Sequence, residues 1–139
     1  MNRRVGKKLS RRLVTAALIG DAARVRALLR AGADPGRANR EGTTPLYQAS
    51  VHGDTAVVEL LLAAGAGPDA ESGHGSEGLP LCGAACWGHT DTVRALLAAG
   101  ADPSLREDGG TGLTPLEWAE RGAHAETAAV LRAARGAGA

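Results

Sequence analysis

A pattern of 33 residues recurs along this chain, and it limits the possible folds more than any other feature. Leucine-rich runs that end in Gly-Ala occupy residues 28–33, 60–66 and 96–101, and Pro-Leu pairs stand at 45–46, 80–81 and 115–116. A fixed period of this size is typical of a stack of small units, none of which can bury its own apolar face alone. We therefore predict a repeat protein, which favours a binding module over an enzyme.

Each unit carries signals for two short helices. The hydroxyls of Thr44 and Thr114 can cap a helix N-terminus. A proline follows at the first helical position, where its missing N–H costs nothing: Pro45, Pro80 and Pro115. A glycine then allows a tight turn, and a second glycine ends the second, leucine-rich helix as a left-handed cap. The turn glycines are Gly53 and Gly88, and the terminal glycines are Gly32, Gly65 and Gly100.

The composition supports the same prediction. The length of 139 residues fits one domain. Aromatic residues make up only 2% and phenylalanine is absent, so the core must be aliphatic and rich in alanine. Such a core is typical of close-packed helix pairs, and it argues against a β-sandwich or an αβ enzyme. No stretch reaches the roughly 18 apolar residues that a membrane span requires.

These motifs resemble the ankyrin repeat family over about residues 9–135. The resemblance rests on the Thr-Pro-Leu openings, the central glycines, the paired aliphatics and the Gly-Ala-Asp closings at 32–34 and 100–102. It implies an all-α solenoid of four helix-turn-helix units with β-turn finger loops. The units are expected at about 9–38, 39–71, 72–106 and 107–135, with a basic tail at 1–8 and a flexible tail at 136–139.

Several positions depart from the family pattern. Arg12 stands where the first unit would have proline, Gly67 where the second would have aspartate, and Ala123 where the fourth would have its central glycine. The finger loops at 66–79 and 101–114 should each be two residues longer than the family norm. The opening histidine of the family is replaced in three units, by Tyr47, Cys82 and Glu117.

The resemblance also implies a partner-binding groove, lined by the finger tips and the exposed end of each first helix. Carried over by position, the candidate residues are Arg40, Glu41, Thr43, Tyr47, Val51, His52, Cys86, Trp87, Leu113 and Arg121. Trp87 is the best single anchor, because tryptophan is over-represented among binding hot spots; the alternative is a ring that only shields nearby alanines. Trp118 takes a leucine position of the family, so core packing is favoured there, and Tyr47 fits either role.

The resemblance implies a non-catalytic module that binds a partner protein, with no cofactor. An alternative is a regulatory or chaperone-like accessory subunit of a partner enzyme. A third reading is an enzyme that uses Cys86 or a histidine of the groove. We expect a cytoplasmic protein that is a monomer on its own.

Positive charge is concentrated at the N-terminus. The first twelve residues hold six basic and no acidic side chains, so the remaining chain carries ten basic against fifteen acidic residues. One interpretation is a solvated tail and the polar face of a capping helix; the other is contact with an acidic partner, nucleic acid or lipid. No aromatics interleave the charges, which disfavours nucleic acid. Arg3-Arg4 superficially resembles an export signal, but the apolar run at 13–20 is short and fits the first repeat helix.

Cys82 and Cys86 lie four residues apart on one predicted helix, in poor geometry for a disulfide. His89 could add a third metal ligand, but no fourth stands at matching spacing. We therefore expect two small, largely buried thiols and no metal site. His89 and His124 fall where the resembled family has a turn histidine that braces the backbone, so a structural role is expected for both.

The repeat pattern predicts uneven local stability. The finger loops near residues 73–78 and 108–112 are rich in glycine and lack apolar anchors, so their amides should exchange with solvent faster than those of residues 60–62 and 96–97. Hydrogen exchange followed by mass spectrometry measures this difference. Equal protection in loops and helices would contradict the prediction.

Overall fold

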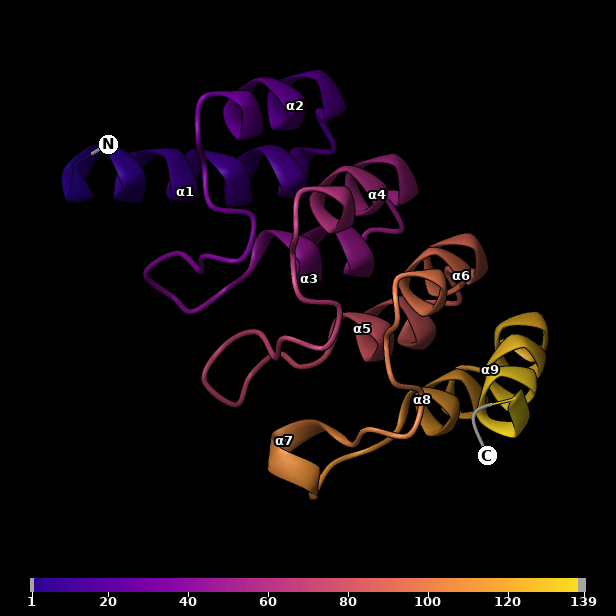
Figure 1. The fold of residues 1–139 in the computed structure, drawn as a ribbon. Helices are drawn as coiled ribbons and strands as arrows, with labels where there is room; N and C mark the ends of the chain where they lie inside the picture. The colour runs from indigo at the N-terminus through magenta and orange to yellow at the C-terminus, as the bar shows by residue number, and fades with distance from the viewer. Residues whose placement is uncertain (1, 138–139) are drawn as a thin grey trace.

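The computed structural model describes residues 2–137, which form helices and no strand (Figure 1). The helices are α1 (Arg3–Ile19), α2 (Ala22–Arg30), α3 (Pro45–Val51), α4 (Thr55–Ala63), α5 (Pro80–Cys86), α6 (Thr90–Ala98), α7 (Glu107–Gly110), α8 (Pro115–Arg121) and α9 (Ala125–Ala137). The element α7 is a single turn in which Asp108 and Gly109 have positive φ, so it belongs to a loop and is not a regular helix.

The helices pack in two layers. Helices α1, α3, α5 and α8 lie side by side in one layer, and α2, α4, α6 and α9 form the other. Within each pair the chain reverses at a tight turn, and the three long loops between pairs project to one side of the stack (Figure 1). The predicted all-α solenoid of helix-turn-helix units is thereby confirmed.

Local capping explains where the first helices begin. The Thr44 hydroxyl accepts a hydrogen bond from the Tyr47 N–H at 3.2 Å, and Thr114 accepts one from the Glu117 N–H at the same distance. Each threonine has an extended backbone and is followed by the proline that opens the helix. The N-cap residue of α5 is Leu79, whose side chain cannot accept a hydrogen bond.

The turns hold neighbouring helix pairs in register. Gly53 has a φ of +68°, and a Cβ atom at this position would lie 2.5 Å from Nδ1 of His89 in the next unit. The His89 Nε2 lies 2.9 Å from the carbonyl oxygen of Val51. Gly88 and His124 repeat the arrangement, with the His124 Nε2 3.0 Å from the Cys86 carbonyl oxygen. The structural role predicted for both histidines is thus confirmed.

The core lies between the two layers and runs the length of the stack. Its largest fully buried aliphatic side chains come from every helix pair: Leu13, Val25, Val57, Val58, Leu61, Leu81, Val93, Leu96 and Leu131. Burying each such leucine or valine contributes about 1.5–3 kcal/mol. Hydroxyl pairs link the second helices, at 2.8 Å between Thr55 and Thr92 and 2.7 Å between Thr90 and Thr127.

The two chain ends differ from the expected tails. Helix α1 begins at Arg3, capped by the Asn2 side chain, so the boundary placed after residue 8 falls inside a helix of 17 residues. The other first helices, α3, α5 and α8, have seven residues each. Helix α9 continues to Ala137, so the tail expected at 136–139 starts within it, and residues 138–139 lie outside the described chain. Within residues 2–137, no helix combines the length and apolar character needed to cross a membrane.

Ala123 occupies the turn position of the last pair with a φ of +58°, where the preceding turns have glycine. Left-handed backbone costs an L-residue about 1–2 kcal/mol, partly offset by the greater chain entropy of unfolded glycine. Ala123→Gly should therefore raise the free energy of unfolding by about 0.5–1 kcal/mol. Urea denaturation measures this change.

Gly88→Ala is the matched reverse substitution, because it forces the same strained φ and drives a Cβ atom against His124. It should lower the free energy of unfolding by more than Ala123→Gly raises it. If both substitutions left the stability unchanged, the turn would not be a constraint on the stack.

Candidate functional site

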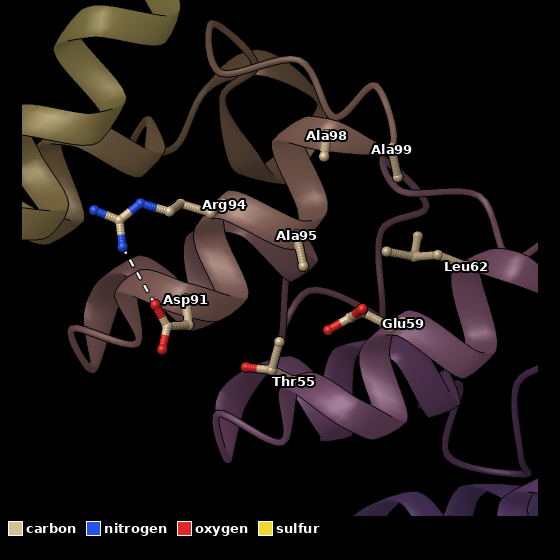
Figure 2. Close-up of a pocket in the computed structure, with 8 residues that line it drawn as sticks. All are labelled: Thr55, Glu59, Leu62, Asp91, Arg94, Ala95, Ala98 and Ala99. Carbon is tan, nitrogen blue, oxygen red and sulfur yellow. Dashed lines mark hydrogen bonds and ion pairs between the residues drawn. The ribbon is translucent and has the colours of Figure 1, made fainter.

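One hollow of the surface lies between α4 and α6 and has a volume of about 680 Å³. Figure 2 shows Thr55, Glu59 and Leu62 of α4 beside Ala95 and Ala98 of α6, while Arg94 points away from α4 and is paired to Asp91 at 3.2 Å. All of its lining side chains are exposed or partly exposed, and most are small or solvated. This hollow is the furrow between two adjacent second helices, and it brings no set of polar groups to a common point.

The three loops between helix pairs form a second, more organised surface. We name them finger 1 (residues 31–44), finger 2 (64–79) and finger 3 (99–114), which contains α7. The carboxylate of Glu77 ties the first two fingers together. Its oxygens accept hydrogen bonds from the Thr43 hydroxyl at 3.0 Å and the Ser72 hydroxyl at 2.8 Å, while the Ser72 oxygen accepts the Thr44 N–H at 2.9 Å.

One unit later, the carboxylate of Glu107 links finger 3 to finger 2 and to α8. Its Oε2 accepts the N–H of Leu79 at 3.1 Å, and its Oε1 accepts the indole N–H of Trp118 at 2.7 Å. Ser72 and Glu107 occupy corresponding positions in successive fingers, and each receives the N–H of the residue that precedes a first helix. Glu107 therefore anchors the residue that precedes α5, as Ser72 anchors Thr44.

Glu107 is only 9% exposed. Burial raises the pKa of its carboxyl group, while the hydrogen bonds from Trp118 and Leu79 act in the opposite direction. The charge of Glu107 also affects the pKa of the nearby Tyr47. The pKa of Tyr47 is raised to about 12, first by burial and then by the charges of Glu107 and Glu77. A half-buried tyrosine and two carboxylates thus lie within electrostatic reach of one another near the fingers.

The residues predicted at the helix ends are accessible to different degrees. Trp87 is 63% exposed and His52 is exposed, whereas Val51 and Cys86 are half-buried. The hydrogen bonds of His89 and His124 bring the ends of α3, α5 and α8 alongside one another. Arg121 is exposed, and its guanidinium carbon lies 5.9 Å from the ring centre of Trp118, a contact that the repeat pattern does not predict.

The residues predicted on the fingers divide into two groups. Arg40 and Glu41 are exposed. Thr43 is 5% exposed and its hydroxyl is bound to Glu77, so it stabilises the fingers and offers nothing to a partner. Leu113 is half-buried, and its carbonyl oxygen accepts hydrogen bonds from the Glu107 N–H and the Cys82 thiol.

The thiols are not prepared for nucleophilic chemistry. Both are free; Cys82 is buried and Cys86 partly so. Burial and the nearby charge of Glu107 raise the pKa of both thiols, which is the opposite of what a reactive cysteine requires. Among the described residues, no group of three or more His, Cys, Asp or Glu side chains is placed to hold a metal ion.

A family model of ankyrin repeats, comprising three copies, matches residues 13–107. The chain belongs to the ankyrin repeat family. A search of curated proteins found no match. The last helix pair, α8 and α9, lies beyond the matched residues but packs on α5 and α6 as each earlier ankyrin pair packs on its neighbour. Ankyrin repeats are protein-interaction modules, and such stacks expose extended surfaces suited to that role.

The repeat pattern did not identify the polar contacts of the ankyrin fingers. Glu77 and Glu107 fall in the inserted loops, where the alignment of units is least certain. One signal was present, since Leu79 stands where a capping threonine is expected, which marks an unusual start for α5. Trp118 packs against the core as predicted, but its hydrogen bond to Glu107 follows only from the folded structure.

Replacing Glu107 with alanine should leave the Leu79 and Trp118 N–H groups without acceptors. Each unpaired buried donor costs about 1–3 kcal/mol, so Glu107→Ala should lower the free energy of unfolding by about 2–4 kcal/mol. Urea denaturation followed by tryptophan fluorescence measures the effect. Glu71→Ala removes an exposed carboxylate from finger 2 and is the control, for which we expect almost no change.

Proposed function

We propose that this ankyrin chain is a non-catalytic module that binds a partner protein on the face formed by its first helices and fingers. The observation that carries the proposal is the exposure of Trp87. A tryptophan that is 63% exposed leaves a large apolar ring in water. Such rings at the centre of a surface are among the commonest anchors of protein interfaces.

The surroundings of Trp87 suit an interface. His52 holds the equivalent position one unit earlier and is exposed, and Val51 and Cys86 supply partly buried apolar surface beside the two. Helix α5 has seven residues, so the helix ends lie about 10 Å from the finger side of the same layer. A partner that spans this distance would reach Tyr47 and the exposed finger residues Arg40 and Glu41. Leu113 and Arg121 extend the proposed surface toward α8.

Two features support binding rather than catalysis. The raised pKa of Cys82 and Cys86 keeps both thiols protonated near neutral pH. His89 and His124 each place Nε2 on a backbone carbonyl oxygen of the preceding unit and pack Nδ1 against a turn glycine, so both rings are used to hold the turns.

Three more detailed expectations about this chain remain predictions. These are a monomer in isolation, a cytoplasmic location, and the alternative role as an accessory subunit of an enzyme. Co-purification from native extract separates the two roles, because a stoichiometric enzyme partner whose activity changes on removal of this chain would favour the accessory subunit.

Trp87→Ala should weaken partner binding by about 2 kcal/mol or more, because truncating an aromatic hot spot removes its contact area. Because the Trp87 side chain is exposed, its removal should leave helicity and thermal stability nearly unchanged. Quantitative mass spectrometry of proteins captured by the wild type and the variant identifies the partner, and titration calorimetry with that partner measures the affinity.

Arg30→Ala is the control, because Arg30 is exposed on α2, in the other layer. It should change neither binding nor stability. Unfolding of the Trp87→Ala protein would show that the ring is needed for packing. If the Trp87→Ala protein stays folded and binds normally, the interface lies away from the helix ends.

A further inference from the structure

A cationic cleft lies where the N-terminal half of α1 runs over finger 1. Its volume is about 330 Å³. Five of its lining residues are basic, and they come from both walls: Arg4, Lys7 and Arg11 of α1, and Arg37 and Arg40 of finger 1. The other lining residues are Ser10, Ala38 and Asn39. Figure 1 shows this part of α1 extending beyond the other first helices, on the side toward which the fingers project.

Both walls of the cleft are held in place. Arg4, Lys7 and Arg11 follow one face of a helix because they are three and four residues apart. Asn2 caps that helix by accepting the Val5 N–H at 2.9 Å. In finger 1, the Asn39 side chain accepts the N–H groups of Glu41 and Thr43, both at 3.0 Å. The cations are therefore presented by ordered backbone and not by a tail.

The positive charge of the cleft is uncompensated within residues 2–137. No acidic side chain is among the lining residues, and none of the five cations forms an ion pair. The nearest acids in the sequence are Asp34, whose carboxylate accepts the Gly36 N–H, and Glu41 at the finger tip. Arginine and lysine side chains gathered in this way favour an anionic ligand, and the planar guanidinium groups can each bind a carboxylate through two hydrogen bonds.

We infer that this cleft binds a short run of aspartate or glutamate carboxylates in the partner protein. The inference deepens the proposed function, because it gives the chemistry of one segment of the partner and the end of the stack where that segment lies. Charge along the stack supports it. The cleft is basic, whereas fingers 2 and 3 carry Glu71, Glu77, Glu107 and Asp108, so an acidic segment is attracted to the N-terminal end and repelled from the others.

Three observations favour an acidic peptide over nucleic acid. No aromatic residue lines the cleft, so bases would find no ring on which to stack. The cleft is also short, since Arg4 and Arg11 are separated by about 10 Å along the helix. Beyond residue 12 the chain has ten basic and fifteen acidic residues, which would repel a long polyanion.

The test uses the full chain and a short, fluorescein-labelled polyglutamate peptide, with polyglutamine as the uncharged comparison. Fluorescence anisotropy at low salt should show binding of polyglutamate only. Arg4→Gln/Lys7→Gln should weaken that binding about five- to tenfold, and Arg37→Gln/Arg40→Gln, on the other wall, should do the same. Circular dichroism confirms that each variant stays helical.

Arg3→Gln/Lys8→Gln is the matched control. It makes the same two substitutions on the same helix, changes the net charge equally, and affects exposed residues that do not line the cleft. Binding should stay within about twofold of the wild type. Equal losses in this control and in Arg4→Gln/Lys7→Gln would show that only net charge matters and would overturn the inference.

Other outcomes would overturn it as well. One is a failure of polyglutamate to bind; another is tighter binding of a single-stranded oligonucleotide or of anionic phosphatidylserine vesicles through the same residues. Trp87→Ala should leave polyglutamate binding unchanged, because Trp87 is far along the stack. A failure of the cleft inference is thus distinguishable from a failure of the proposed Trp87 interface.

Discussion

The contact between the His89 imidazole and the preceding turn holds this molecule in register. A helix pair of this size cannot bury its apolar face alone, so each pair depends on correct placement against the next. The ring occupies the space left by the missing side chain of Gly53 and reaches the Val51 carbonyl oxygen at 2.9 Å. Gly88 and His124 repeat the contact. Shifting either ring would misplace the leucines and valines of two layers at once.

The fingers are held by a different kind of interaction. They contain few apolar residues, and the carboxylates of half-buried Glu77 and buried Glu107 take over the role that a hydrophobic anchor would otherwise have. Glu77 joins two hydroxyl groups, and Glu107 joins a backbone N–H to an indole N–H. A charged group in a partly buried site is costly unless it is fully hydrogen-bonded. These contacts therefore make the inserted loops dependent on their neighbours, in the same way as the helices.

The side of the stack that carries the first helices and fingers differs in charge between its two ends. At the N-terminus, an extended α1 and finger 1 gather five cations around a cleft. Farther along, the fingers carry carboxylates, and the helix ends expose His52 and Trp87. A basic cleft at one end of the stack and carboxylates on the later fingers would favour one orientation of a bound protein, because a reversed partner would place like charges together.

The sequence by itself determined the helix pairs, their capping threonines and prolines, the turn glycines and the bracing histidines. Each of these features acts within one unit or at a fixed repeat offset, so periodicity was enough to locate them. The tertiary structure alone decided that the Thr43 hydroxyl is buried against Glu77 and that Glu77 and Glu107 link successive fingers. It also decided that residues 3–8 continue α1, against the expected tail. The physical reason is that the finger contacts join residues far apart in the chain, by 34 positions for Thr43 and Glu77, inside loops whose lengths break the repeat. The cleft is a feature of the same kind, because α1 and finger 1 come together only in the folded stack.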